Sequence, residues 1–479
     1  MKIGAKSKKV IAKIGLELMK VDFIMNQYLK WGEKIILKNL VEKNERNRPI
    51  GAQQEKYYIV RNLMKAFERK LRANALAPGV RNFVFNRLIG DVIINWRERH
   101  PDAAARRDRE DPLPLYVVIS PTQKCNLSCI GCYAASTNKT VESLDWDTVD
   151  EIMRQKKELW GSYFTVISGG EPLMWESNGK TILDLYEKYS DTFFLMYTNG
   201  TLIDRATAKR FAELGNVAPA ISVEGFEEDT DYRRGKGVYK KILTAIDHLR
   251  SEGVLYGISF TATRQNADNI LHDDFIDEFF DTQGAAFAWM FQYMPIGRNP
   301  DFNLMLTPEQ RRNLWFSEQH IIKDKEIFFV DFWNGGPISD GCICAGRKGG
   351  YMYFDWSGNV MPCVFVPYSV GNINKDFFDK GKNLNDILET PFFTKLREWQ
   401  AGYSYKKPSP ETGNEITPCP IRDHHSEFHR IVESTHAIPV GKSTERASHD
   451  ENYIKGLTRI GEEAHKATID IWKKQYQQI

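Results

Sequence analysis

The run Cys125-Asn126-Leu127-Ser128-Cys129-Ile130-Gly131-Cys132-Tyr133 places three cysteines within eight residues. A loop with this spacing can present three thiolates to one iron–sulfur cluster, which cysteine thiolates normally hold in fours. Three ligands leave one iron open to a substrate or cofactor, which favours chemistry over electron storage. A structural zinc site is the alternative, but zinc usually takes paired Cys-x-x-Cys elements and a closed shell of four ligands. No fourth cysteine or histidine lies nearby in the sequence, so a cluster is favoured.

Composition and charge limit the class of protein. The chain has 479 residues, enough for two or three domains or for one barrel with additions, and its net charge of +2 does not indicate a nucleic-acid partner. Seven cysteines, unevenly placed, do not form a disulfide scaffold and indicate metal ligands in a reducing compartment. No signal-peptide core and no apolar run of about 18 residues is found. These features predict a cytoplasmic protein.

The region around the cysteine loop alternates between short β-rich runs and amphipathic helical runs. This alternation predicts parallel βαβ units, and six units fit a partial barrel whose functional side chains follow the carboxyl ends of the strands. The fold class expected is α/β, a partial (β/α)6 TIM-like barrel with an N-terminal helical region and a small C-terminal domain. The expected strands are 115–119, 163–167, 193–197, 220–223, 255–261 and 287–293, with helices such as 146–159 and 239–251.

Further motifs follow the expected strands in order. The second strand ends in Ser168-Gly169-Gly170-Glu171-Pro172, in which two glycines allow close backbone approach to a ligand and a carboxylate can accept hydrogen bonds from an ammonium group. The third ends in Tyr197-Thr198-Asn199-Gly200, and the fourth in Ser222-Val223-Glu224-Gly225. Tyr232-Arg233-Arg234-Gly235 comes next, where a planar guanidinium could pair with a carboxylate.

Together with the cysteine loop, these motifs resemble the radical S-adenosylmethionine (SAM) superfamily. The resemblance implies that Cys125, Cys129 and Cys132 hold a 4Fe–4S cluster and that Gly169, Gly170 and Glu171 hold the amino group of SAM. It further implies that Thr198 and Asn199 lie near the methionyl end, and that Ser222 contacts its ribose or carboxylate. Glu224 replaces the commoner Asp of the family motif, and Arg234 is favoured over Arg233 as the partner of the SAM carboxylate. The implied activity is reductive cleavage of SAM to a 5′-deoxyadenosyl radical that abstracts hydrogen from an unactivated carbon, with an electron from a reductant such as flavodoxin or ferredoxin. The residues that act on the substrate are not identified.

One position departs from the family pattern. Many relatives have an aromatic residue just before the third cysteine, near the adenine of SAM, where this chain has Gly131. Either Tyr133 substitutes for it, or the adenine contact comes from elsewhere. Aromatic and Met residues at 287–294 are expected to be mostly core, but those at the carboxyl end of the strand could line the substrate pocket. The same holds for Asp331, Trp333 and Asn334.

The other four cysteines are Cys342, Cys344, Cys363 and Cys419. The spacing from Cys344, or from Cys342, through Gly358 to Cys363 resembles the opening of SPASM and twitch domains, which carry auxiliary Fe–S clusters. The cysteine-rich run for a second auxiliary cluster is missing, so the resemblance implies a truncated domain. One auxiliary cluster would be bound by Cys363, Cys419 and one or both of Cys342 and Cys344. The alternative is a metal-free domain with buried thiols.

The first 48 residues carry twelve Lys and Arg against five Asp and Glu, a net charge of +7, with apolar residues at helical spacing. Such a helix can lie in a membrane interface or pack on its own domain. A membrane lipid and a peptide or protein are therefore both candidate substrates, and peripheral contact with the inner face of the membrane is expected if the first holds. A non-catalytic Fe–S protein that transfers electrons or senses redox state at the membrane is the alternative function, but it leaves the motifs at successive strand ends unexplained.

The expected organisation follows from these features. It runs as a basic amphipathic segment at 1–48, a helical region and linker at 49–112 with the linker at 102–112, a radical SAM core at 113–300, a connecting segment at 301–340, a SPASM/twitch-like domain at 341–430 and a helical tail at 431–479.

Overall fold

The computed structural model describes residues 22–139 and 142–477, and its centre is one curved sheet. The nine strands lie in the order β11-β10-β1-β2-β5-β6-β7-β8-β9, and every neighbouring pair is parallel except β10 and β11. The strands are β1 Tyr116–Ile119, β2 Phe164–Ile167, β5 Phe193–Thr198, β6 Val217–Ser222, β7 Gly257–Ala262, β8 Ala288–Gln292, β9 Phe329–Asp331, β10 Tyr351–Phe354 and β11 Val360–Met361. The predicted partial barrel is confirmed.

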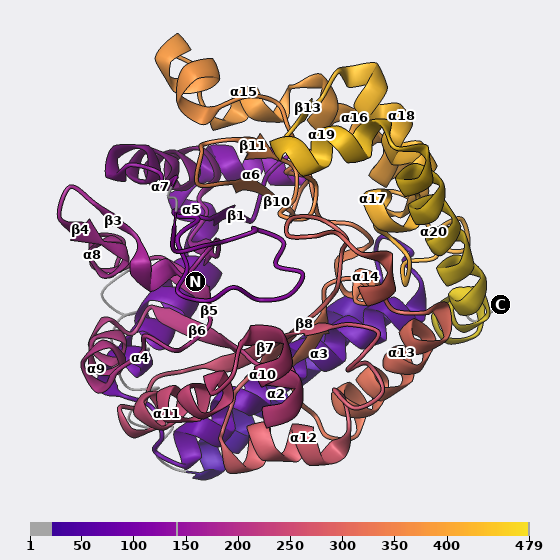
Figure 1. The fold of residues 1–479 in the computed structure, drawn as a ribbon. Coiled ribbons are helices and arrows are strands. Elements are labelled where there is room, and N and C mark those ends of the chain that lie inside the picture. Colours follow the sequence, from indigo (N-terminus) through magenta and orange to yellow (C-terminus); the bar gives the residue numbers. More distant parts are fainter. Residues whose placement is uncertain (1–21, 140–141, 478–479) are drawn as a thin grey trace.

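Helices surround the sheet on its outer side (Figure 1). Their amphipathic faces bury apolar residues against the strands: in α7, Val149, Ile152 and Met153 are all fully buried. The barrel helices are α7 Trp146–Trp160, α8 Ile182–Lys188, α9 Arg205–Leu214, α10 Glu227–Arg234, α11 Val238–Ser251, α12 Asp273–Asp277 and α13 Pro308–Lys323. Two small antiparallel sheets complete the strands: the hairpin of β3 Glu176–Ser177 with β4 Lys180–Thr181, and the pair of β12 Tyr368–Ser369 with the distant β13 Ile438–Pro439.

The sheet extends beyond the six expected strands at both ends. β9 comes from the expected connecting segment and pairs with β8. β10 comes from the expected C-terminal domain and pairs with β1 in register, Tyr116 opposite Tyr351 and Ile119 opposite Phe354. The C-terminal cysteine region is therefore continuous with the barrel through backbone hydrogen bonds.

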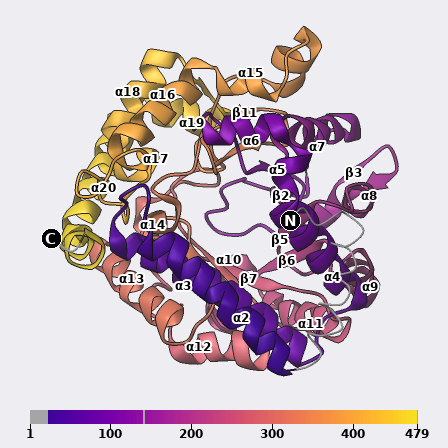
Figure 2. The ribbon, with the colours of Figure 1, turned by 180° about the vertical axis from the view of Figure 1, so that it is seen from behind.

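The helices before the barrel differ from the expected organisation at the linker. The charged stretch expected as a linker at 102–112 mostly forms α6, Pro101–Asp108, because Pro101 occupies the first helical turn and Ala103 and Ala104 are buried. The others are α2 Asp22–Leu37, α3 Ile50–Arg72, α4 Pro78–Asn82 and α5 Trp96–Arg99. Helices α2 and α3 cross the far side of the view in Figure 1 and the near side in Figure 2.

The C-terminal helices cover one flank of the molecule (Figure 1). They are α14 Gly336–Ser339, α15 Leu384–Leu388, α16 Pro391–Gln400, α17 Pro420–Asp423, α18 His425–Thr435, α19 Gly441–His449 and α20 Glu451–Ile471. Tighter 3-10 turns lie at Pro172–Met174, Phe302–Leu304 and Phe378–Lys380, and wider π turns at Lys38–Glu42, Phe83–Ile94, Glu278–Thr282, Ile373–Phe377, Ala401–Tyr405 and Trp472–Gln477.

The predicted N-terminal segment divides into two parts with different surroundings. Residues 1–21 lie outside the described residues, and in α2 the side chain of Trp31 is 64% exposed. Arg48, in contrast, is 3% exposed and forms ion pairs with Asp340 and Glu415 of the C-terminal region. Residues near Arg48 therefore belong to the folded core. Among the described helices, none combines the length and the apolar character that a membrane span needs.

Candidate iron–sulfur and SAM site

A cavity of about 240 Å³ lies inside the barrel, and Cys125, Cys129 and Cys132 all line it. The predicted cysteine loop follows β1 directly and thus faces the barrel interior. The rest of the wall is mainly aromatic and aliphatic, with Tyr116, Val118, Phe164, Val166, Leu195, Tyr197, Phe260, Trp289, Phe291, Phe332, Tyr351 and Phe365.

Hydrogen bonds fix the first cysteine of the loop. Its Sγ accepts from the backbone N–H of Leu127 at 3.4 Å and from Asn199 Nδ2 at 3.7 Å. Burial raises the pKa of the Cys125 thiol to about 12, so that the thiol is neutral without a metal. A bound iron would hold it as the thiolate, because a coordinating thiol is deprotonated.

The arrangement of the cysteines fits a cluster better than a single ion. In the described part of the chain, no three His, Cys, Asp or Glu side chains converge as ligands of one metal ion. Zinc requires such convergence on a tetrahedral point. In a cluster each thiolate binds a different iron, so its ligands are farther apart than those of a single ion, and the three cysteines here line one common cavity.

The two glycines after β2 pack against the backbone of the cysteine loop. A Cβ at Gly170 would lie 2.1 Å from the carbonyl oxygen of Lys124, and one at Gly169, whose φ is +114°, would lie 2.8 Å from that of Thr122. Larger residues would therefore displace the loop. Both glycines line the cavity, where their backbone can approach a ligand closely.

Glu171 does not line the cavity. Its Oε1 accepts from Thr198 Oγ1 at 2.7 Å, and its Oε2 accepts from the backbone N–H of Asn199 at 2.9 Å. Burial raises the pKa of this carboxyl group, although these hydrogen bonds oppose the shift. Glu171 thus joins the ends of β2 and β5, and in this geometry it positions Thr198 and Asn199, which do line the cavity. Its predicted contact with the amino group of SAM stays a prediction.

Glu224 is likewise fully buried behind the cavity wall and pairs with both candidate arginines. Its Oε1 accepts from Arg233 and from Nε of Arg234 at 2.9 Å, and its Oε2 accepts from the backbone N–H of Thr261 at 2.9 Å. Arg233 and Arg234 both line the cavity. Burial acts to lower the pKa of Arg234, but the nearby carboxylate of Glu224 and the cysteines of the loop raise it. Glu224 therefore orients a cation toward the cysteine loop.

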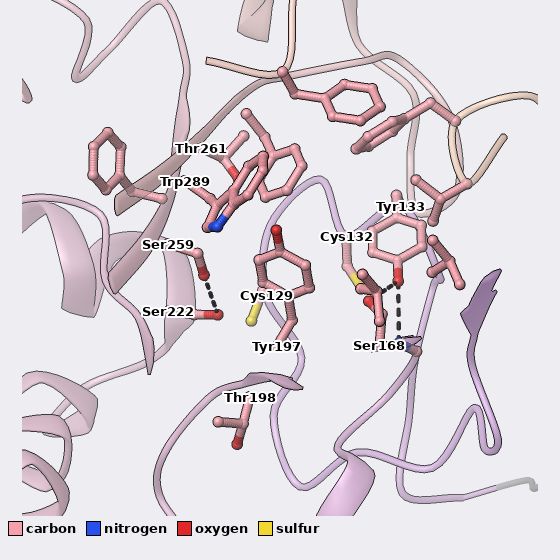
Figure 3. Close-up of a pocket in the computed structure, with 18 of the residues that line it drawn as sticks. Cys129, Cys132, Tyr133, Ser168, Tyr197, Thr198, Ser222, Ser259, Thr261 and Trp289 are labelled. Atoms are coloured by element: carbon pink, nitrogen blue, oxygen red, sulfur yellow. Dashed lines mark hydrogen bonds between the residues drawn. The ribbon is translucent and has the colours of Figure 1, made fainter. Parts of the chain in front are cut away.

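Hydroxyl groups mark two edges of the cavity (Figure 3). Ser222 and Ser259, from neighbouring strands β6 and β7, have their Oγ atoms 3.3 Å apart. The hydroxyl of Tyr133 lies 2.7 Å from Ser168 Oγ and accepts from the backbone N–H of Gly169 at 3.2 Å. Ser222, as predicted, lines the cavity at the carboxyl end of its strand.

Tyr293 explains the departure at Gly131. A Cβ at Gly131, whose φ is +63°, would lie 2.5 Å from Cε2 of Tyr293, so no aromatic side chain fits at this position. Tyr293 itself lines the cavity, and its hydroxyl accepts from the backbone N–H of Asp301 at 3.2 Å. A ring from the end of β8 thus occupies the space beside the third cysteine. The sequence pattern places Tyr293 only within a set of candidate pocket residues.

Gln292 is a buried polar group on the cavity wall that the sequence analysis did not single out. Its Nε2 donates to Asp331 Oδ2 at 2.6 Å, while its Oε1 has no partner among residues 22–139 and 142–477. Asp331, Trp333 and Asn334, candidates for the pocket, do not line it, whereas Phe332 does. β9 ends at Asp331, so Phe332 lines the cavity from the turn that follows the strand.

The four C-terminal cysteines do not line the cavity themselves, but their chain neighbours Ile343, Val364 and Phe365 do. A hydrogen bond to Cys342, burial, and the nearby Cys363 and Cys419 all raise the pKa of the Cys344 thiol. Burial has the largest effect on the Cys419 thiol and raises its pKa. The nearby Cys342, Asp423 and Cys363 raise this pKa further. All four thiols are thus close enough to interact.

Backbone contacts hold these cysteines together. The N–H of Ala345 donates to the carbonyl of Pro362, which joins the segments of Cys344 and Cys363. A Cβ at Gly336 would lie 2.0 Å from the carbonyl of Glu415, so the segments before Cys342 and Cys419 pack closely. Four thiolates are the usual ligands of an iron–sulfur cluster, and Cys342, Cys344, Cys363 and Cys419 supply this number.

Comparison with known proteins agrees with this geometry. The family model of the radical SAM superfamily matches residues 119–268, and that of the iron–sulfur cluster-binding SPASM domain matches residues 342–412. The chain is 32% identical over 162 residues to Fe-coproporphyrin III synthase of Methanosarcina barkeri, a match that covers 34% of this chain but only 40% of that relative. It is 24% identical over 317 residues to AdoMet-dependent heme synthase of the same organism, covering 60% of this chain and 85% of the relative.

A solved structure shows the same fold. SuiB of Streptococcus suis, in a crystal structure with its precursor peptide SuiA, superposes with a TM-score of 0.51 at 17% identity and covers 67% of this chain and 76% of that chain. The motifs, the cysteine geometry and the two domain matches agree in kind and order. The chain therefore contains a radical SAM domain over residues 119–268 and a SPASM domain over residues 342–412.

Proposed function

We propose that this chain uses SAM and a cluster held by Cys125, Cys129 and Cys132 to abstract hydrogen from an uncharged side chain or backbone carbon of a peptide or protein. When bound, the cluster and SAM supply a 5′-deoxyadenosyl radical, with one electron from a small reductant protein of the flavodoxin or ferredoxin type. The chain's own residues bind and orient SAM and the substrate, and its aromatic walls exclude water.

The proposed roles at the SAM end belong to residues that line the cavity. In this proposal Gly169, Gly170, Thr198 and Asn199 contact the methionyl end of SAM, and Ser222 contacts its ribose or carboxylate. Arg234, held by Glu224, balances the carboxylate of SAM. Tyr293 packs against the adenine in place of the aromatic residue absent at Gly131.

One observation supports an uncharged substrate with a hydrogen-bond donor: Oε1 of Gln292, a residue on the cavity wall, has no partner among residues 22–139 and 142–477. An unpaired buried acceptor costs about 1–3 kcal/mol, which a bound N–H group would recover. A peptide backbone or side chain offers such a donor. An alkyl chain of a lipid does not, and the carboxylates of a tetrapyrrole would find only Arg233 and Arg234 as cations on the cavity wall. The peptide-bound structure of SuiB is consistent with this choice.

Transfer of deuterium tests both the reaction and the substrate. Anaerobic enzyme with dithionite and SAM is expected to release 5′-deoxyadenosine, and Cys129→Ala is expected to abolish this release. With a deuterated peptide digest, with deuterated phospholipid vesicles and with deuterated coproporphyrin as separate probes, deuterium is expected in 5′-deoxyadenosine only from the peptides. An intact first cluster without release of 5′-deoxyadenosine would instead favour the electron-carrier function.

Gln292 gives a sharper test with a matched variant. Gln292→Met keeps the volume but removes the acceptor, and we expect a loss of deuterium transfer of about 5- to 150-fold, as about 1–3 kcal/mol implies. Release of 5′-deoxyadenosine without substrate should stay at the wild-type rate. Equal deuterium transfer by both proteins would remove Gln292 from substrate binding.

Contact with a membrane is a separate proposal, supported by exposed Trp31 and Ile35 one turn apart on α2. Deleting 1–48 would also remove Arg48 and its buried ion pairs, so the substitutions Trp31→Glu and Ile35→Glu are the cleaner test. Unchanged binding to anionic liposomes would contradict an interfacial role of this helix face.

A further inference from the structure

Arg422, on α17, is a buried guanidinium group without a hydrogen-bond acceptor. Its side chain is 1% exposed, and neither Nε nor Nη1 has a partner in the described part of the chain. Burying a charge without partners is costly. Its neighbour Arg311 is equally buried but donates to Asp423 and to Asn334, so the missing acceptor is specific to Arg422.

A second unpaired donor lies beside it. The guanidinium of Arg422 lies 5.2 Å from the centre of the Trp333 ring, and Nε1 of Trp333 also lacks an acceptor among the described residues. The Trp333 ring centre is 4.7 Å from that of Phe365, whose backbone N–H donates to Sγ of Cys363. Arg422 follows Cys419 by three residues, and its backbone N–H donates to the Cys419 thiol, so Arg422 lies next to the four-cysteine set.

Neither donor belongs to the substrate cavity, since Arg422 and Trp333 do not line it. The nearby carboxylates are already engaged: Asp423 accepts from Arg311, and Asp331 accepts from Gln292 and from the backbone N–H of Trp333. We therefore expect an anionic hydrogen-bond acceptor other than a carboxylate next to Cys419. A cluster held by four thiolates is negatively charged, and its sulfurs accept hydrogen bonds.

We propose that Arg422 is a positioning residue of the auxiliary cluster. Its guanidinium donates hydrogen bonds to the cluster and raises the reduction potential of the cluster. The inference rests on the proposed binding of that cluster by Cys342, Cys344, Cys363 and Cys419. Reduction adds one negative charge to the cluster, and a desolvated cation at short range stabilises the reduced form.

A redox titration of the auxiliary cluster tests this role. In full-length protein with Cys129→Ala, only the auxiliary cluster is expected, and its reduced form can be followed by electron paramagnetic resonance. Adding Arg422→Met is expected to lower the ratio of reduced to oxidised cluster at least tenfold at a fixed potential, which equals 59 mV for one electron. Arg422→Lys keeps the charge and is expected to recover part of the shift.

The metal-free protein separates this role from a purely structural one. Because the guanidinium has no hydrogen bond to a described residue, Arg422→Met should unfold in urea at no lower concentration than wild type. Arg311→Met, which loses bonds to Asp423, Asn334 and the carbonyl of Ile416, should unfold at a clearly lower one.

Two outcomes would overturn the inference in distinguishable ways. Absence of iron from the Cys129→Ala protein would remove the auxiliary cluster itself and, with it, the role of Arg422. A fully loaded cluster whose potential is the same with Arg422→Met would leave the proposed cluster intact and contradict only the role of Arg422.

Discussion

At the scale of single residues, the site depends on pairs of residues. In one pair a glycine leaves space for a ring, and in the other a carboxylate orients a guanidinium. Gly131 leaves space for Tyr293, and Glu224 holds Arg234 against the cavity. The first pair joins segments that are distant in the sequence, whereas the second joins the end of β6 to the helix that follows it. A substitution in one member should therefore act through the other.

Gly131→Ala tests the first pair. The new Cβ would lie 2.5 Å from the Tyr293 ring at a backbone φ of +63°, so we expect a loss of about 1–3 kcal/mol in free energy of unfolding and weaker SAM binding. Urea denaturation of the metal-free protein and calorimetry with the loaded protein measure the two effects. In a double variant with Tyr293→Ala, the loss in stability should be less than the sum of the single losses. Strict additivity would contradict the contact.

Iron content tests the two cysteine sets separately. We expect about eight irons per chain in the wild type, if each set holds one 4Fe–4S cluster, and about four in Cys129→Ala and in Cys419→Ala. Only Cys129→Ala should lose the ability to cleave SAM. An unchanged iron content in Cys419→Ala would contradict an auxiliary cluster bound through this residue.

At the scale of elements, periodicity predicts the barrel well. The six expected strands agree with the structure to within three residues at either end, because each is an apolar run bounded by turn signals. The segment 102–112 misleads because its charges indicate a linker, while its buried Ala103 and Ala104 are too small to give a strong helical pattern. Gln292 could not be identified, because its role depends on pairing with Asp331 in the neighbouring strand.

Helix α18 provides a pH-dependent element. His425 lies against Phe428, and its Nδ1 is 2.7 Å from the carbonyl oxygen of Ile421. Burial lowers the pKa of this imidazole to about 4, from 6.5 in the unfolded chain. The unfolded state therefore binds more protons between these values, and stability should be lost as pH falls from 6.5 to 4, by on the order of 3 kcal/mol.

The comparison of wild type with His425→Leu separates the contribution of His425 to the pH dependence of stability from that of other groups. In the variant, the free energy of unfolding should fall less over the same pH range, as measured by urea denaturation of the metal-free protein at each pH. Parallel curves for the two proteins would exclude His425 as the cause.

At the scale of the whole molecule, the barrel and the C-terminal region form one structure. β10 pairs with β1 along its full length, and α20 packs against α13 and α17. The sequence predicts two domains because the motifs of the two regions lie far apart along the chain. No local pattern in the sequence indicates that β10 pairs with β1. We infer that the two regions unfold together.

Cooperative unfolding provides the test at this scale. In the full chain, far-ultraviolet circular dichroism and tryptophan fluorescence should report one urea transition with the same midpoint. A chain that ends at residue 340 leaves the edge of β1 unpaired and should aggregate, since open strand edges pair with other chains. A monomeric, folded fragment would contradict the dependence of the barrel on β10.

The pairing of β10 with β1 also has a consequence for biosynthesis. On the ribosome, β1 and the cysteine loop emerge early, but the strand that completes their edge is made only after all the other parallel strands of the sheet. At about 5–20 residues per second, the nascent barrel waits for many seconds with this edge open. During that interval the edge of β1 is uncovered, so we expect iron and sulfide to reach the first cluster site more readily in the nascent chain than in the finished protein, where β10 covers this edge.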